Sequence, residues 1–413
     1  MHAKFIRGFL LTAGASLLLA TAGCHRPPDK TLAVATNAPG TAADRPLPAY
    51  QTQLLDLALA TATAIPVIPH IKDRSRAQEA VVTACFDLGQ SQRALAGIEK
   101  IDDWRRGAGY ADYAFYCARH GDPKKAPHYL DLANQLAEAT EDWPRDCIRV
   151  KIAQTHAWLG QHPQAEQFEQ GIEACESGKV ARVRAMRCDT ASFEAQTKAL
   201  EVLVATGNFD SVKNALESYT QLFDRFYDDV KRRGQVEAKI KAAWRPLPVF
   251  IRADLLMAMA GFALDHADQG QALLLVDEAR RMLDGRSFPL EEYIPLMAKL
   301  TELRFRAGDG RKARAEADVL RARYDAEKTA MVDIYRAGTL RSLAEAYQTL
   351  GDRAVTLAMY TQAVDAGAQN PNARPRAEDL SATCVSLAVH AVRPDAGLWA
   401  RMRAIRAALA DPW

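Results

Sequence analysis

The chain has 413 residues, of which 48% are hydrophobic and 25% are charged. This composition is ordinary for a globular protein and excludes an intrinsically disordered one. The 53 Lys and Arg residues nearly balance the 51 Asp and Glu residues, and Lys4 and Arg7 account for the difference. A nucleic-acid-binding protein needs a basic face to neutralise phosphates, so this balance argues against that class of function.

Residues 1–23 have the pattern of a secretory signal. Lys4 and Arg7 precede an uncharged, largely apolar run over residues 8–23, which is too short to span a bilayer comfortably. The residues Thr21-Ala22-Gly23-Cys24 resemble the lipobox of bacterial lipoproteins, a family that usually has Leu at the position of Thr21. The resemblance implies cleavage before Cys24 and acylation of Cys24, which would hold the protein at a membrane. An uncleaved anchor and plain secretion are the alternatives.

Residues 24–49 are rich in Pro, Ala and Thr and contain almost no large apolar side chains. Such a segment cannot bury enough surface to offset the entropy of ordering it, so we expect a flexible tether. His25 follows the cysteine, where an Asp would resemble an inner-membrane retention signal. We therefore expect an outer-membrane lipoprotein that faces the periplasm, with inner-membrane retention as the alternative.

From residue 50 onward the sequence is predicted to be helical, because apolar residues recur three and four positions apart and no segment alternates like a strand. In a recurring sequence motif, a helix ends at a Gly or a small residue and a polar turn follows. A small residue then begins the apolar stripe of the next helix. Gly permits the left-handed conformation that ends a helix, and Asp or Asn caps the next one. These turns are expected at Gly89, Gly121, Gly160, Gly207, Ala267, Gly308 and Gly351.

The clearest copy of this motif is Leu343-Ala344 and Tyr347, followed by Gly351-Asp352 and Tyr360. Here the chain resembles the tetratricopeptide repeat (TPR) family over about residues 70–370, with a weaker further unit toward Ala407. The resemblance implies an all-α fold, a TPR-like α-α hairpin solenoid, because one hairpin cannot bury its apolar stripe alone. The intervals between turns vary and are mostly longer than the regular repeat of the family, which predicts lengthened helices and loops.

The longest interval, from Gly207 to Ala267, contains a densely charged stretch over 228–234 and the prolines Pro246 and Pro248. A helix has to end before these prolines, so we place a joint here and expect two sets of repeats, over residues 50–232 and 233–413. The alternative is one rigid body with a long helix and a loop. We expect an open, curved array, and a closed ring around an acidic cavity would contradict this expectation.

No motif for a metal, a phosphate or a catalytic nucleophile assembles in the sequence. The nine histidines are scattered without His-Glu-x-x-His spacing, and Gly308-Asp-Gly-Arg-Lys312 lacks the spacing of a phosphate loop. No Gly-x-Ser-x-Gly elbow occurs. We therefore expect no metal, no cofactor and no enzymatic activity. The alternative is a helical periplasmic enzyme that acts on cell-wall glycan from a concave groove, with carboxylates supplied by distant segments.

Six cysteines follow Cys24 in a compartment that is expected to be oxidising. Cys147 and Cys175 lie at similar distances before and after Gly160, so an antiparallel hairpin would bring the two together. A disulfide between Cys147 and Cys175 is predicted, with a Cys175–Cys188 bond and free thiols as the alternatives.

In proteins that the repeats resemble, ligands lie along the concave face that the first helix of each hairpin lines. Counting back from each turn places a set of aromatic, charged and amide side chains on that face, and Arg and aromatic anchors are what interfaces favour. The set is Phe86, Phe115, Arg119, Trp158, Phe305, Arg306, Arg341, Glu345 and Gln348. The aromatic members alternatively fill space between hairpins. We predict a lipid-anchored scaffold or adaptor that binds a protein or peptide in this groove in the cell envelope, and the sequence does not define its oligomeric state.

Overall fold

The computed structural model describes residues 44–413, which lie within one compact unit. These residues form α-helices and contain no strand, which confirms the all-α prediction for this part of the chain. None of the described helices is both long and apolar enough to cross a membrane. The expected signal, Cys24 and residues 24–43 of the expected tether lie outside the described residues.

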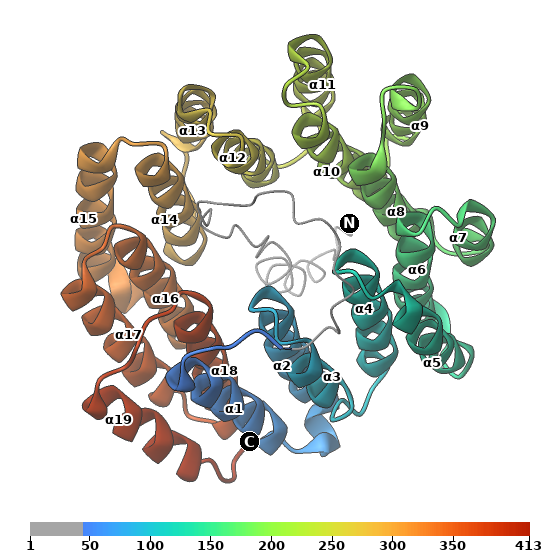
Figure 1. Cartoon of the computed structure of the whole chain (residues 1–413). Helices are drawn as coiled ribbons and strands as arrows, with labels where there is room; N and C mark the ends of the chain where they lie inside the picture. Colours follow the sequence, from blue (N-terminus) through green and yellow to red (C-terminus); the bar gives the residue numbers. More distant parts are fainter. Residues whose placement is uncertain (1–43) are drawn as a thin grey trace, which may run out of the picture. The chain divides into compact units, whose positions relative to one another are not determined.

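Helices of an inner and an outer layer alternate along the chain (Figure 1). The inner layer consists of α2 (Val67–Asp87), α4 (Arg105–Arg119), α6 (Asp142–Trp158), α8 (Ala174–Arg187), α10 (Phe209–Arg225), α12 (Val249–Asp265), α14 (Leu290–Arg306), α16 (Asp333–Thr349) and α18 (Ala373–Val389). The outer layer consists of α1 (Ala49–Ala64), α3 (Ser91–Ile98), α5 (Ala126–Glu138), α7 (His162–Glu169), α9 (Phe193–Ala205), α11 (Val230–Ala243), α13 (Gln269–Leu283), α15 (Gly310–Glu327), α17 (Arg353–Ala368) and α19 (Ala396–Ala407). Each inner helix packs against the outer helix that follows it and against the next inner helix. Short 3-10 helices lie at Pro123–Lys125 and Lys328–Ala330.

The predicted turn chemistry is present at most of the expected positions. Gly308 and Gly351 have positive φ values of 95° and 77°, and each ends an inner helix. The Asp that follows each Gly accepts a hydrogen bond from a backbone N–H of the next helix, as Asp352 does from Val355. Ala267 adopts the same left-handed conformation (φ 58°) without the freedom of Gly. Backbone conformation and capping therefore determine these helix ends.

Two hairpin turns were missed because they contain no Gly. One lies between α8 and α9, where the Asp189 carboxylate accepts hydrogen bonds from the N–H (2.8 Å) and hydroxyl (2.6 Å) of Ser192. The other lies between α10 and α11, where Asp229 caps α11. Gly207 instead joins the outer helix α9 to the inner helix α10. The two longest intervals, on either side of Gly207, therefore reflect missed turns rather than lengthened repeats.

The expected joint between residues 232 and 233 falls inside α11, so the structure does not place a boundary there. The inner helix α10 packs against both α8 and α12, and one apolar cluster contains residues from both sides, including Phe223 and Leu256. The packing of the array is therefore continuous through this region.

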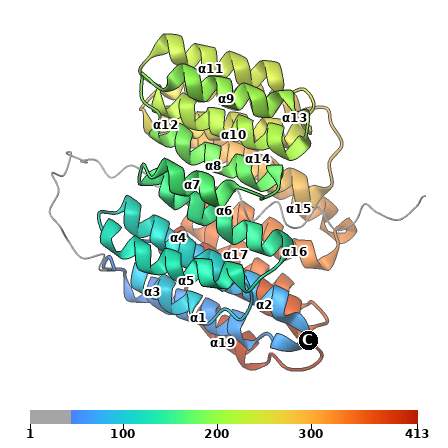
Figure 2. The same ribbon diagram turned by 90° about the vertical axis from the view of Figure 1, so that its right-hand side faces the viewer.

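The last inner helix of the array, α18, meets the first two helices, which corrects the expectation of an open, curved array. The inner helix α18 packs against α2, and it packs more extensively against α1. Figures 1 and 2 both place α1 between α19 and α3 in the outer layer. The described helices therefore close into a ring.

Hydrogen bonds show how α1 lies on α18. Gln51 Nε2 donates to the Ala388 carbonyl (2.7 Å), and Ser381 Oγ donates to the Ala58 carbonyl (3.1 Å). Along this contact the residue number rises in α1 while it falls in α18, so the two helices are antiparallel. In this way α1 packs on α18 as a second outer helix in addition to α19, although it comes from the other end of the described chain.

Asp44–Pro48, the last residues of the expected tether, are held against the turn between α2 and α3. The Arg45 N–H donates to the Gly89 carbonyl (3.0 Å). The Asp44 carboxylate accepts hydrogen bonds from the backbone N–H groups of Gln92 (2.7 Å) and Arg93 (3.3 Å), and so it caps α3. This segment therefore belongs to the folded unit.

Candidate functional site

The predicted groove residues separate into two sets on different inner helices. The first set lies on α4 and α6 and the second on α14 and α16. The first consists of Phe115, Arg119 and Trp158, and the second of Phe305, Arg306, Arg341, Glu345 and Gln348. The remaining predicted residue, Phe86, lies on α2 outside both sets.

The first set converges at the C-terminal ends of its helices. The Phe115 and Trp158 rings pack edge to face with centroids 5.7 Å apart. The Arg119 guanidinium lies 5.6 Å from the Phe115 centroid and 5.2 Å from the Trp158 centroid. Arg187, from the end of α8, also lies 5.2 Å from the Trp158 centroid. We call Phe115, Arg119, Trp158 and Arg187 the arginine–aromatic cluster.

The arginines of this cluster are exposed, whereas its rings are half-buried. Neither Arg119 nor Arg187 forms an ion pair with a carboxylate among the described residues, and neither does the exposed Arg182 of α8. Burial, together with the charge of Arg182, lowers the pKa of Arg119. Arg119 and Arg187 are the last residues of α4 and α8, and the helix dipole favours cations at helix C-termini. The cluster is therefore a cationic patch built on aromatic rings.

The sequence analysis did not predict Arg182 and Arg187 as site residues. It placed inner-face residues by counting back from the Gly of each turn, and the turn after α8 contains no Gly. The signal that was available is the repetition of Arg at positions 182, 184 and 187 of one predicted helix. The structure separates these three, because Arg184 forms an ion pair with Glu169 of α7.

Three residues of the second set connect α16 to α18. Arg341 Nη1 lies 3.2 Å from Asp379 Oδ1, and Gln348 Nε2 donates to the His390 carbonyl (3.3 Å). Glu345 Oε1 accepts a hydrogen bond from Ser386 Oγ (2.6 Å). These side chains are already engaged within the protein, so their geometry is that of contacts between helices.

The other two members of the second set lie on α14 and also contact neighbouring elements. Arg306 Nη2 donates to Asp265 Oδ1 at the end of α12 (3.4 Å). The Phe305 ring lies against Gly310 at the start of α15, where a Cβ would meet the ring at 3.4 Å. Phe305 therefore fills space at a hairpin turn.

Titratable groups gather where α14, α16 and α18 meet. Burial and the charge of Glu345 together raise the pKa of Glu302 to about 7, against the opposing effect of His390, Lys299 and Arg306. His390 Nδ1 lies 3.9 Å from Glu345 Oε1, and the pKa of His390 is raised by Glu345 and Glu302 against the effect of burial. The cluster therefore contains a carboxyl group of raised pKa, Glu302, close enough to Glu345 to be affected by its charge.

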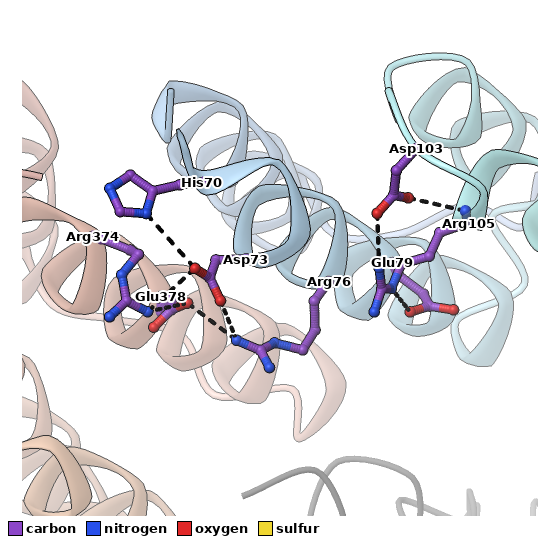
Figure 3. Close-up of polar contacts among 8 residues, drawn as sticks. All are labelled: His70, Asp73, Arg76, Glu79, Asp103, Arg105, Arg374 and Glu378. Atoms are coloured by element: carbon purple, nitrogen blue, oxygen red, sulfur yellow. Dashed lines mark hydrogen bonds and ion pairs between the residues drawn. The ribbon is translucent and has the colours of Figure 1, made fainter. Parts of the chain in front are cut away.

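Figure 3 shows a polar network where the first and last inner helices meet. Asp73 and Arg76 of α2 face Arg374 and Glu378 of α18, with alternating charges. Across the two helices, Arg374 Nη1 lies 3.5 Å from Asp73 and Arg76 Nη2 lies 3.5 Å from Glu378. Within each helix, Arg76 lies 2.6 Å from Asp73 and Arg374 lies 3.4 Å from Glu378. The network holds α2 and α18 in register.

A second group of ion pairs in Figure 3 joins α2 to the start of α4. Arg105 Nε lies 3.2 Å from Glu79 Oε2, and Arg105 Nη1 lies 2.7 Å from Asp103 Oδ2. Burial raises the pKa of Glu79, while Lys151 and Arg105 lower it. These ion pairs hold the start of α4 against α2, and they occupy the Arg105 guanidinium.

Cys147 is buried in α6, and burial raises the pKa of its thiol to about 12. The side chain of Cys175 is outside the described residues, so the Cys147–Cys175 disulfide stays a prediction. Cys188, the alternative partner of Cys175, is also buried, and its thiol lies 3.5 Å from the Ser192 hydroxyl.

Among the described residues, no group of His, Cys, Asp and Glu is arranged to hold a metal ion. The fold and the site define an all-α protein of alternating inner and outer helices with a cationic, aromatic patch on three inner helices. No family model matches the chain, and no curated protein is significantly similar to it.

Proposed function

We propose that this protein is a lipid-anchored, TPR-like helical scaffold that binds a protein or peptide partner in the bacterial cell envelope. One observation carries the binding part of this proposal: Phe115, Arg119 and Trp158 come together on adjacent inner helices. Half-buried aromatic rings and exposed arginines are the side chains that binding hot spots favour. The TPR-like solenoid is supported by the consecutive hairpins and their Gly and Asp turns.

The lipid anchor rests on the lipobox resemblance at Thr21–Cys24 and on the signal-like segment before it. Cys24→Ala removes the acylated thiol, so the variant should move from the membrane fraction to the soluble envelope fraction. Retention of the variant in the membrane would assign the anchor to another element.

Photocrosslinking in the native envelope followed by mass spectrometry tests the binding role. We expect a crosslinked partner with the unaltered chain and its loss in an Arg119→Gln/Trp158→Leu variant. Arg401→Gln is a matched control, because Arg401 is an exposed arginine that pairs with Asp365 on the outer layer. Thermal unfolding of each variant verifies that the fold is intact. Capture that survives in the folded double variant contradicts a role for this surface.

A second candidate function is a periplasmic enzyme that acts on cell-wall glycan, which the Glu302–Glu345 arrangement favours. Glycosidases pair a carboxylic acid of raised pKa with a second carboxyl group, and the pKa of Glu302 is raised by burial and by the nearby Glu345. Against this candidate, Glu345 already accepts a hydrogen bond from Ser386. Release of soluble fragments from purified cell wall by the unaltered chain, and its loss in Glu302→Gln, would establish the enzyme and displace the scaffold proposal.

A further inference from the structure

The arginine–aromatic cluster holds two guanidinium groups against one indole ring. Arg119 and Arg187 come from different helices and each lies 5.2 Å from the Trp158 centroid. A guanidinium that stacks on a ring keeps its planar N–H edge available for hydrogen bonds to an oxyanion. The stack therefore fixes the position of two cations while it leaves their donors accessible.

The charge of this surface is not neutralised within the protein. Arg119, Arg182 and Arg187 are exposed, and no carboxylate among the described residues pairs with them. Burial and, second to it, the charge of Arg182 lower the pKa of Arg119, as expected for two neighbouring cations. By contrast, Arg184 on the same helix pairs with Glu169. A ligand with negative charges would complement the charge of Arg119, Arg182 and Arg187.

Aromatic rings extend the surface across neighbouring inner helices. Phe115 of α4 packs on Trp158 of α6, and Arg187 of α8 lies against the same indole ring, so the three helices form a row. A row that crosses three helices suits an extended chain with several contacts rather than a single small anion.

We propose that the arginine–aromatic cluster binds an extended, acidic peptide segment of the partner, with its Asp or Glu carboxylates on Arg119, Arg182 and Arg187. This inference rests on the proposed scaffold function and names the chemistry of its partner. The aromatic rings accept the apolar side chains and backbone of the same segment.

Fluorescence anisotropy with labelled peptides of equal length tests this inference on the full chain. We expect oligoglutamate to bind at least about tenfold tighter than oligoglutamine and oligolysine not to bind, with affinity falling as salt rises. Arg119→Gln/Arg187→Gln should weaken oligoglutamate binding by about tenfold or more, since each loses a charge-assisted contact. The Arg401→Gln variant should bind like the unaltered chain.

Equal binding of oligoglutamate and oligoglutamine, or unchanged binding by the double variant, would overturn the inference. Displacement of oligoglutamate by low concentrations of inorganic pyrophosphate would also overturn it, because the surface would then be an oxyanion site. The two proposals fail separately. A partner that crosslinks equally to the unaltered chain and to Arg119→Gln/Arg187→Gln leaves the scaffold function standing without the acidic contact, whereas peptide binding without any envelope partner refutes the scaffold function.

Discussion

Removal of the two buried hydrogen bonds between α1 and α18 should loosen the closure of the ring. Gln51 Nε2 and Ser381 Oγ donate to carbonyls of the opposite helix at 2.7 and 3.1 Å. In Gln51→Ala/Ser381→Ala both donors disappear. The Ala388 carbonyl keeps the bond from the Ala391 N–H (3.2 Å), so it is not left unpaired. The expected cost is therefore the net value of two hydrogen bonds, about 2 kcal/mol, rather than a desolvation penalty.

A loss of about 2 kcal/mol corresponds to roughly a 30-fold increase in the open population of α1. Hydrogen exchange measures this directly, because amides of a locally opening helix exchange in proportion to that population. We expect α1 to lose protection while α4 to α16 keep theirs. Ser342→Ala removes a hydrogen bond within α16, to the Gly338 carbonyl (3.3 Å), and serves as the control. Unchanged exchange of α1, or an equal change in every helix, would refute the reasoning that α1 docks as a separable element.

The ion pairs between α2 and α18 should matter less than these hydrogen bonds. Arg76, Glu378, Arg374 and Asp73 have side chains 24% to 42% exposed, and exposed ion pairs each contribute only about 0–1 kcal/mol. Raising the salt concentration screens them. Its effect on the exchange of α1 should therefore be smaller than that of the double variant.

Three further predictions concern buried groups. The pKa of Glu302 in the folded chain lies above its ordinary value, so the stability cost of ionising it grows as the pH rises from 4.5 to about 7 and is complete above that range. Glu302→Gln should therefore raise the unfolding temperature relative to the unaltered chain much more at about pH 8 than at about pH 5, and an equal rise at both would contradict this. Arg304 is 1% exposed and bonds Glu316 (3.0 Å) and Asp277 (2.6 Å), while Arg280 and Lys312 also pair with these carboxylates. Arg304→Met should therefore cost about 1–3 kcal/mol in urea unfolding, and an unchanged stability would contradict this. Alkylation in denaturant tests the predicted Cys147 disulfide, and equal thiol counts with and without reductant would exclude it.

The regular part of the fold could be predicted because its signals are local. Gly308 and Gly351 mark helix ends through a backbone conformation that few other residues adopt, and the following Asp marks the next helix start. Where the chain achieves the same turn by other means, the prediction failed. At Asp189 and Ser192 a side-chain network replaces Gly, and a turn of this kind leaves no comparable signature in the sequence.

The closure of the ring depends on complementarity between segments at opposite ends of the described chain, and no local pattern encodes it. The pattern of α1 is that of an ordinary helix, with Leu54, Leu55 and Ala58 buried. Nothing in residues 49–64 alone says that their partner is α18 rather than a following helix. The polar residues Gln51 and Ser381 form the specific contacts, but each is common on solvated helix faces and acquires meaning only beside the other.

The difference between local signals and contacts with neighbouring helices also explains which residues of the candidate site could be predicted. Phe115, Arg119 and Trp158 were found because α4 and α6 end at Gly turns, which set the helical phase from which each residue is counted. Arg187 occupies the matching place on α8 and was missed because that helix ends without Gly. Glu345 has the same helical phase as the first set, yet it bonds Ser386, because α18 presents a hydroxyl to it. Phase determines which side chains reach the inner face, but only the neighbouring helix determines whether they remain available to a partner.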